Sequence, residues 1–309
     1  MSEVPDYQSE QLKRQSRGRS KIGRRAWFAK TLALLAPPAL AAVYSRYESN
    51  WLEVTRTPIG LADMPQGRKI KILHLSDLHL SETVSAEDIE EAFKEGLRES
   101  PHACMITGDF ITDQPSAEKM QRLQNCLSRY AKQLPVFACL GNHDGGTWAA
   151  ENGGFSTSEN VSLMLRNAKV RLLHNQRVSV MLNRTPVTIS GVGDLWSREC
   201  LPMKCLSKKV PTPSTRSLLN LVLCHNPDAK ELLRPFDWDL LLCGHTHGGQ
   251  LRIPFTKYAP LAPVKDLSMT EGLHSYDERS IYVTRGVGSL YGLRLNCRPE
   301  ASLLELTSS

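Results

Sequence analysis

The sequence lacks the paired cysteines that hold a structural zinc ion or a disulfide framework. It has eight cysteines but no Cys-x-x-Cys pair, which argues against a zinc knuckle. Cys104, Cys139, Cys224 and Cys243 each lie in a different apolar run, where a free cysteine behaves as a small buried hydrophobe. We therefore expect reduced cysteines, which favours a body that faces the cytosol.

The chain also lacks an uninterrupted apolar run of the ~20 residues that a membrane span requires. The uncharged stretch 31–44 is shorter and contains Pro37 and Pro38, which interrupt a helix. Basic residues precede this stretch, at Lys13, Arg14, Arg17, Arg19, Lys21, Arg24 and Arg25. We interpret 1–20 as a disordered basic tail, 21–45 as a membrane segment and 46–68 as a linker.

Three interpretations of 21–45 stay open. It is a membrane anchor or interfacial helix at an anionic surface, an export signal in which GRRAWFAK is twin-arginine-like, or a soluble amphipathic helix. The first places the protein at a bacterial inner membrane, with the cytoplasmic face favoured, and the second exports it. A membrane surface is therefore an expected partner.

The remainder of the chain has little net charge. Its overall charge is +6, with 41% hydrophobic and 23% charged residues, and without the basic residues near the amino terminus it is close to neutral. No basic stripe with interleaved aromatic residues occurs, so we expect no nucleic-acid partner. The composition is that of an ordinary globular protein.

From residue 69 onward, short apolar runs alternate with amphipathic helical stretches. Strand patterns at 69–77, 102–109 and 135–144 alternate with helical patterns at 86–100 and 116–133, which predicts a parallel α/β layer. Strand-like runs at 176–182, 185–193, 279–288 and 300–306, with buried strands at 218–227 and 236–250, suggest a second sheet. We predict one α/β domain over 69–309, with two packed sheets and helices outside.

Five of the apolar runs end in side chains that bind metal ions. They are Asp77 and His79 in LHLSDLH, Asp109 in MITGD, Asn142, His143 and Asp144 in CLGNHD, His225 in LCHN, and His245 and His247 in LLCGHTH. Sites in open α/β sheets form beyond the carboxyl ends of strands, so we expect these groups to meet.

A mixed set of oxygen and imidazole ligands without thiolate suits manganese, iron or zinc. The set has more ligands than one ion can coordinate, so we expect two divalent metal ions. Manganese is the favoured metal, and Asp109 is the expected bridge between the ions. Two ions about 3.5–4 Å apart generate a hydroxide and stabilise both oxygens of a phosphate displacement. His143 remains as the acid for the leaving group, and Asp144 is expected to orient it or raise its pKa.

The motifs DLH, GD, GNHD, CH and GHTH, in this order, resemble the calcineurin-like binuclear metallophosphoesterase superfamily over residues 69–306. The resemblance implies a four-layer α/β/β/α sandwich of two mixed sheets. It also implies one metal held by Asp77, His79, Asp109 and His247, and a second held by Asp109, Asn142, His225 and His245.

Further segments, among them GVGDLW, CHNPD and TRGVGSLYGLRLNCRPE, are similar to bacterial phosphodiesterases and UDP-2,3-diacylglucosamine pyrophosphatases of this family. The resemblance implies a hydrolase that acts on a phosphodiester or nucleotide-lipid substrate, such as UDP-2,3-diacylglucosamine in lipid A biosynthesis. Arg285, Arg294 and Arg298 are candidates for phosphate contacts. The alternatives are an exported cell-envelope phosphodiesterase and a non-catalytic, metal-dependent binding module. The oligomeric state is left open.

Overall fold

The computed structural model describes residues 40–208, 218–253, 256 and 258–309. The chain divides into a unit that ends at Tyr44 and a larger unit from Ser45 to Ser309. The expected basic tail and residues 21–39 of the expected membrane segment lie outside the described residues. None of the helices in the described part of the chain combines the length and the apolar character that a bilayer crossing needs.

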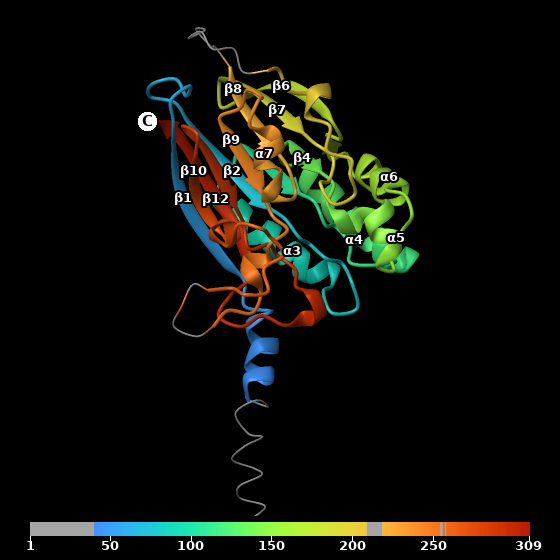
Figure 1. Ribbon diagram of the computed structural model, residues 1–309. Coiled ribbons are helices and arrows are strands. Elements are labelled where there is room, and N and C mark those ends of the chain that lie inside the picture. Colours follow the sequence, from blue (N-terminus) through green and yellow to red (C-terminus); the bar gives the residue numbers. More distant parts are fainter. Residues whose placement is uncertain (1–39, 209–217, 254–255, 257) are drawn as a thin grey trace, which may run out of the picture. The chain divides into compact units, whose positions relative to one another are not determined.

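The larger unit contains two six-stranded sheets (Figure 1). The first sheet has the order β1-β12-β2-β3-β4-β5, and only the β12–β2 pair is antiparallel. Its strands are β1 (Glu53–Leu61), β2 (Lys69–Leu75), β3 (Ala103–Thr107), β4 (Val136–Cys139), β5 (Arg171–Leu172) and β12 (Glu300–Ser308). This sheet is therefore mixed, with β2, β3 and β4 parallel to one another.

The second sheet has the order β10-β11-β9-β8-β7-β6. Antiparallel pairs close both edges, and the four central strands are parallel. Its strands are β6 (Gln176–Leu182), β7 (Thr185–Gly191), β8 (Leu219–Leu223), β9 (Leu240–Cys243), β10 (Gly272–Tyr276) and β11 (Arg279–Val283).

Alternating side chains build separate apolar layers on the two faces of each sheet, because successive residues of a strand point to opposite faces. In β2, Ile70 and Ile72 face the second sheet, whereas Leu73 and Leu75 pack in the cluster that includes the helices. In β9, Leu240 and Leu242 join the layer between the sheets. The central strands are thus buried on both faces, which explains their nearly continuous apolar runs.

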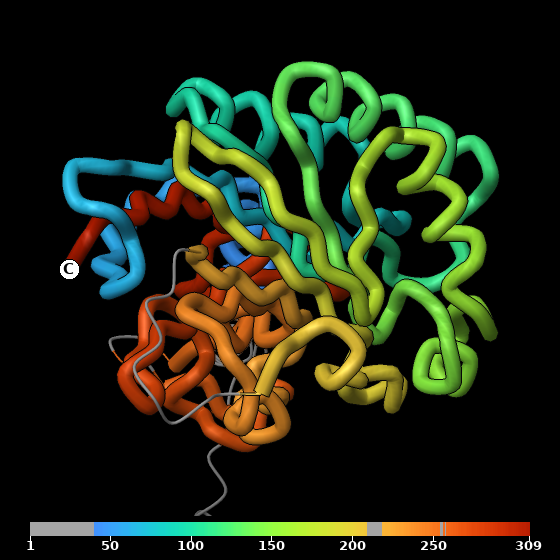
Figure 2. The backbone as a smooth tube through the Cα atoms, turned by 90° about the horizontal axis from the view of Figure 1, so that it is seen from above, coloured from blue at the N-terminus to red at the C-terminus, as the bar shows by residue number. Residues whose placement is uncertain are grey.

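Helices cover the outer faces of both sheets, and this confirms the four-layer α/β/β/α sandwich. Against the first sheet lie α3 (Ala86–Leu97), α4 (Ala117–Ala131) and α6 (Glu159–Asn167) (Figure 2). Ser85 and Asp88 form a capping box that starts α3, and Ile89 and Phe93 bury one face of it. The outer layer of the second sheet is thinner, with the short helix α7 (Lys230–Leu233) and the turn η3 (Pro227–Ala229).

Short helical segments complete the loops between the main elements. They are α5 (Thr147–Glu151), η1 (Asn142–Asp144), η2 (Pro202–Lys204), η4 (His247–Gly249), η5 (Leu267–Thr270) and η6 (Leu290–Gly292). All eight cysteines are free and buried, whereas the sequence predicts burial only for Cys104, Cys139, Cys224 and Cys243.

One domain boundary and one sheet assignment that the sequence suggests are wrong. The expected linker 46–68 contains β1, which pairs along its whole length with β12, so the domain begins at Ser45 and not at residue 69. In addition, the sequence pattern places β12 in the second sheet, but it lies in the first, between β1 and β2. Pro58 and alternating exposure along β1 are typical of an edge strand, and they hide it from a search for apolar runs.

The residues that begin the larger unit are fixed to its carboxyl-terminal loops. The Glu48 carboxylate accepts hydrogen bonds from the backbone N–H of Asn296 at 2.9 Å and of Cys297 at 2.6 Å. The Cys297 thiol in turn donates to the backbone carbonyl of His247 at 3.1 Å. The residues from Ser45 up to β1 thus belong to the same packed structure as the end of the chain.

Candidate metal centre

The carboxyl ends of β2, β3 and β4 in the first sheet meet those of β8 and β9 in the second. The predicted ligands follow these ends directly, and the structure brings them together. Three overlapping groups of side chains have ligand atoms within 4.8 Å of one another: Asp77, His79 and His247; His79, Asp109 and His143; and Asp109, His225 and His245. We call the predicted ligands Asp77, His79, Asp109, Asn142, His225, His245 and His247 the metal floor.

One half of the metal floor contains Asp77, His79 and His247. The Nε2 atoms of His79 and His247 lie 3.0 Å apart, and His247 Nε2 lies 3.3 Å from Asp77 Oδ1. His79 Nε2 lies 3.5 Å from Asp109 Oδ2. These atoms converge on one point, so Asp109 borders this half.

The other half contains His225, His245 and Asn142. His225 Nε2 lies 3.1 Å from Asp109 Oδ2 and 3.2 Å from His245 Nδ1. The Oδ1 atom of Asn142 is buried without a hydrogen-bond partner in the described structure, although buried polar atoms are normally satisfied. Asp109 Oδ2 therefore lies close to a histidine of each half.

The donor chemistry of this centre fits divalent cations. The ring Nδ1 of His225 lies 2.6 Å from the carbonyl of Thr107, so Nδ1 carries a proton and Nε2 points into the floor. His79 Nδ1 contacts the Thr112 hydroxyl at 3.0 Å in the same way. Such second contacts fix the tautomer of metal-binding histidines. Lone pairs and carboxylates that face one another repel unless positive charge lies between them.

Burial and mutual charge set the ionisation of the floor. Burial raises the pKa of Asp77 to about 6 and lowers the pKa values of His79 and His245 to about 3. Against the effect of burial, the Asp109 carboxylate raises the pKa of His225 to about 10. His225 and Asp109 thus form an ion pair that a metal ion would replace, with release of a proton.

Five ligands have a left-handed backbone, which non-glycine residues rarely adopt. They are Asp77 (φ 51°), His79 (49°), Asp109 (52°), His245 (70°) and His247 (51°). Each costs on the order of 1–3 kcal/mol, and such residues concentrate at functional sites. The surrounding sheets hold this conformation, for instance through the hydrogen bond from Asp77 N to the Gly108 carbonyl at 3.0 Å. The spacing of the ligands in the sequence does not predict this left-handed backbone.

Two glycines leave room for the ligand carboxylates. A Cβ atom on Gly141 would lie 2.2 Å from Asp109 Oδ1, and one on Gly244 would lie 2.2 Å from Asp77 Oδ2. Both distances are impossible for real atoms, so the carboxylates fit only because these residues have no side chain.

His143 lies at the border of the floor. Its backbone N–H donates to Asp109 Oδ1 at 2.9 Å, and its ring Nδ1 donates to the Thr112 carbonyl at 2.6 Å. The ring packs edge-to-face against His79 and Trp148 and is partly exposed. The position suits a group that delivers a proton from Nε2 to a bound phosphate ester.

Asp144 does not have the catalytic role that its place in GNHD suggests. Its carboxylate is fully buried and accepts hydrogen bonds from the backbone N–H of Phe110 at 2.7 Å and of Gly141 at 2.8 Å. Its hydrogen bonds in the described structure go to these backbone groups and not to the His143 ring, which Thr112 orients. Burial raises the pKa of Asp144 to about 8. Asp144 joins the segments that carry Asp109 and Asn142, so its role is structural.

The prediction that Arg294 contacts a phosphate is also wrong. Its side chain is 0% exposed, because the guanidinium lies inside the carboxyl-terminal loops. All of its hydrogen bonds to oxygen go to backbone carbonyls. These carbonyls belong to Arg285, Gly286, Gly288, His247 and Cys297. Arg294 therefore holds two loops beside the metal floor.

Arg285 and Arg298 have structural partners as well. Arg285 pairs with Glu53 at 2.7 Å and Glu300 at 3.3 Å, in a network that links the two sheets. Arg298 stacks on the Trp51 ring at 4.1 Å and donates to the Trp51 carbonyl. Neither arginine lines the pocket above the metal floor.

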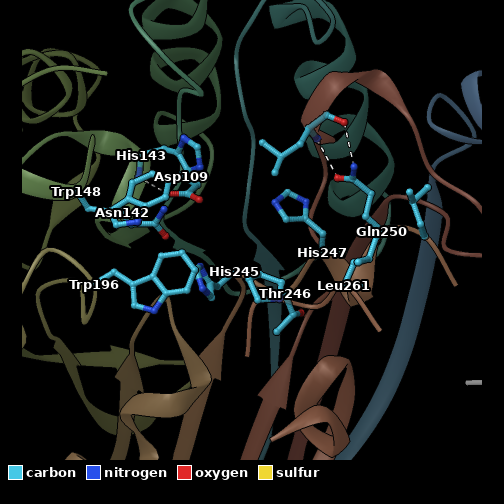
Figure 3. Close-up of a pocket in the computed structure, with 14 residues that line it drawn as sticks. Asp109, Asn142, His143, Trp148, Trp196, His245, Thr246, His247, Gln250 and Leu261 are labelled. Atoms are coloured by element: carbon cyan, nitrogen blue, oxygen red, sulfur yellow. Dashed lines mark hydrogen bonds between the residues drawn. The ribbon is translucent and has the colours of Figure 1, made fainter. Parts of the chain in front are cut away.

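A cavity of about 230 Å³ opens above the metal floor (Figure 3). Its upper wall is apolar, which the sequence does not indicate. We call this wall the apolar rim: Trp148, Trp196, Leu251, Leu261, Pro263 and Leu290. Trp196 packs edge-to-face on His245, with ring centres 4.3 Å apart. Gln250 fixes Leu290 by two backbone hydrogen bonds of 2.9 and 3.0 Å.

Residues 70–249 match the calcineurin-like phosphoesterase family. The chain is 38% identical to phosphodiesterase YaeI of Escherichia coli (strain K12), over 92% of this chain and 99% of that protein. It is 28% identical to the UDP-2,3-diacylglucosamine pyrophosphatase LpxG of Chlamydia trachomatis, over 89% and 96%. Among solved structures, TT1561 of Thermus thermophilus is similar with a TM-score of 0.39 and 12% identity, over 71% and 91%.

Proposed function

The chain belongs to the calcineurin-like phosphoesterase family, and we propose from this that it hydrolyses a phosphodiester or pyrophosphate bond of a membrane lipid with two divalent metal ions. That it is a metal-dependent phosphoesterase follows from the family and from its clustered ligands. The number of ions and the lipid substrate are our proposal.

The observation that carries the two-metal proposal is the position of Asp109 Oδ2. It lies 3.5 Å from His79 Nε2 and 3.1 Å from His225 Nε2, so one carboxylate serves both halves of the floor. Asp77, His79, Asp109 and His247 would hold one ion. Asp109, Asn142, His225 and His245 would hold the other. Oxygen and imidazole ligands favour manganese, with iron and zinc as alternatives.

Two bound ions would supply Lewis acidity that activates water and neutralises charge on the phosphate. The protein supplies the remaining functions. Gly141 and Gly244 leave the space that the carboxylates of Asp109 and Asp77 need. His143 Nε2 gives a proton to the leaving oxygen, while the Thr112 carbonyl holds the ring through Nδ1. The apolar rim limits the access of bulk water.

Three observations support a lipid substrate such as UDP-2,3-diacylglucosamine. The rim is apolar, a relative is named for hydrolysis of this compound, and a basic, then apolar, segment precedes the larger unit. Such a segment suits an anionic membrane surface. We propose the cytoplasmic face of a bacterial inner membrane as the place of action and lipid A biosynthesis as the pathway.

The test uses the full-length protein loaded with manganese. We expect hydrolysis of bis(p-nitrophenyl) phosphate and of UDP-2,3-diacylglucosamine in mixed micelles, and bound manganese near two ions per chain. Hydrolysis of the diester without hydrolysis of the nucleotide lipid would contradict the lipid substrate only. One ion per chain at full activity would contradict the two-metal centre.

An exported cell-envelope phosphodiesterase is the second candidate, and the GRRAWFAK segment favours it. Cell fractionation separates the two. A shortened chain in the periplasm selects export, whereas a full-length chain with the membranes selects the cytoplasmic-face proposal.

A further inference from the structure

Four large apolar side chains are exposed on two neighbouring loops of the larger unit. Ile253, Tyr258 and Leu261 lie between η4 and η5, with exposed fractions of 46%, 53% and 69%, and Tyr291 lies in η6 with 85%. A single apolar residue on a surface is ordinary, whereas several together mark a contact with a membrane or a partner. We call these four residues the docking face.

Hydrogen bonds hold the two loops of the docking face together. The backbone N–H of Arg252 donates to the carbonyl of Leu295 at 2.9 Å. The Gln250 side chain makes two hydrogen bonds to the backbone of Leu290, the residue directly before Tyr291. Both loops lie at the same end of the larger unit (Figure 1). The docking face is therefore one surface to which both loops contribute.

The docking face continues into the cavity above the metal floor. Leu261 is exposed to solvent and also lines that cavity, together with Leu290. The docking face and the apolar rim thus form one apolar path from the protein surface to the cavity. Such a path suits an acyl chain, which loses free energy when it passes through water.

The segments that carry the docking face have no acidic residue. Residues 251–265 and 284–298 contain six lysines and arginines and no aspartate or glutamate. Among the described residues, Lys265 is exposed in the first segment, and Arg46 is exposed beside the second. The Arg46 guanidinium donates to the carbonyl of Gly292 at 3.1 Å. A surface that is apolar and edged with positive charge is complementary to anionic lipid headgroups.

Acidic residues concentrate instead at the starts of α3 and α4. Four of them line one cavity there: Glu82, Glu87, Asp88 and Glu118. Glu118 is paired with Arg122 and Glu82 with Lys119. Glu82 and Tyr291 line a common cavity, so the acidic region borders the docking face on one side. An anionic bilayer would be repelled by this region, which restricts the direction from which it can approach.

The chain enters the larger unit at the docking face. The carbonyl of Ser45 accepts a hydrogen bond from the backbone N–H of Arg294 at 3.1 Å, in the loop that contains Tyr291. The sequence before Ser45 contains the basic residues and the uncharged stretch 31–44. A membrane held by that sequence is therefore tethered next to the loops that expose the four apolar side chains.

We propose that the docking face lies in the interfacial layer of an anionic bilayer, and that the cavity receives its lipid substrate directly from that layer. This rests on the proposed phosphoesterase function and adds the surface through which the enzyme meets its substrate. Tyr258 and Tyr291 have amphipathic rings of the kind that concentrate at membrane–water interfaces. Ile253 and Leu261 supply apolar contact with the upper part of the acyl chains.

Photolabelling of the full-length, manganese-loaded protein tests the contact itself. The probe is a vesicle of phosphatidylethanolamine and phosphatidylglycerol that contains a phospholipid with a diazirine in its acyl chain. We expect adducts on peptides with Ile253, Leu261 or Tyr291 at a level about fivefold or more above peptides with Leu163 or Met181, which are equally exposed, at 50% and 66%, on α6 and β6. Adducts confined to residues before Ser45, or equal on all these peptides, would overturn the proposal.

A double variant tests the consequence for hydrolysis. In Ile253→Ser/Tyr258→Ser, we expect kcat/KM for hexadecyl p-nitrophenyl phosphate in the same vesicles to fall about tenfold, because less apolar surface leaves water at the bilayer. Hydrolysis of soluble bis(p-nitrophenyl) phosphate should not change. The matched control is Leu163→Ser/Met181→Ser, which removes two apolar side chains of similar exposure and should leave both activities unchanged.

The other outcomes overturn the proposal in distinguishable ways. Equal losses on both substrates in the double variant would show damage to the cavity, and no loss on either would show that the face does not contact the bilayer. A dimer of the full-length protein that the double variant dissociates would assign the face to a second copy of the chain. A wild-type protein that is photolabelled as expected but does not hydrolyse bis(p-nitrophenyl) phosphate would overturn the phosphoesterase proposal and leave the membrane contact standing.

Discussion

The metal floor and the apolar rim lie within one cavity, yet the chain builds them differently. Floor residues follow the ends of buried parallel strands, and their positions are fixed by two sheets and by hydrogen bonds at the strand ends. Rim residues come from α5, η6 and the loops after β7 and η4. We therefore expect the sheets to hold the groups that carry out the chemistry, and the loops to set substrate choice, because loops can change without disturbing the fold.

The largest expected effect concerns the floor. Asp109→Ala removes the carboxylate shared by both halves, so we expect bis(p-nitrophenyl) phosphate hydrolysis to fall about 10³-fold or more, with loss of bound manganese. Activity assays and elemental analysis of the purified protein measure both quantities, with Glu118→Ala as the control. Full activity in Asp109→Ala would contradict the proposal that the metal floor carries out the hydrolysis.

His143→Ala tests a group that lies at the border between floor and rim. We expect kcat to fall about 10²–10⁴-fold, since general acid catalysis contributes that much, while bound manganese changes little. His102, at the opposite end of β3, gives the matched control His102→Ala. Equal losses of metal and of kcat would mean that His143 acts as a ligand and not as an acid.

Trp196→Ala sharpens the comparison on the side of the rim. Removing this ring takes away apolar surface that an alkyl arm contacts, at roughly 25 cal/mol per Å². We expect kcat/KM to fall about tenfold for an octyl diester and clearly less for the matching ethyl diester. The control is Trp51→Ala, because Trp51 is exposed and lies outside the cavity. A uniform loss for both diesters would show that Trp196 supports His245 and does not select substrates.

The smallest expected effect concerns His74, which affects the stability of the folded protein and not the catalytic step. It is buried beneath the floor and bonded to Thr107, and burial lowers its pKa to about 3 from 6.5. Below pH 6.5 the unfolded chain binds a proton at His74, whereas the folded chain binds it only near pH 3. The free energy of unfolding therefore decreases as the pH is lowered through this window. Between pH 7 and 5 this costs about 2 kcal/mol.

Urea unfolding of the metal-free protein at pH 7 and pH 5 measures this cost. The loss on acidification should be smaller by about that amount in His74→Leu than in the wild type, whatever the stability of each at pH 7. The same loss in both proteins would show that other groups cause the acid sensitivity.

The sequence predicts the floor because its chemistry is local. Asp77 and His79, or His245 and His247, are close in the chain, and the parallel strands before them can only bring their carboxyl ends to one edge. The rim has no such signal, since Trp148 and Leu261 are far apart in the chain and each is an ordinary apolar residue. The prediction for Arg294 fails for a related reason: arginine is almost never fully buried, so a charged loop residue suggests a surface contact.

The hydrogen bond from the Cys297 backbone N–H to Glu48 shows that the start and the end of the larger unit cannot be treated as separate modules. The residues between Ser45 and β1 are part of the domain and not a separate linker. Glu48 binds the backbone N–H of Cys297, and the Cys297 thiol contacts the carbonyl of His247. A shortened protein that starts at residue 69 would lose an edge strand and part of the frame around a metal ligand. A cut before Ser45 preserves both, so Ser45 is a suitable junction for exchanging the preceding segment.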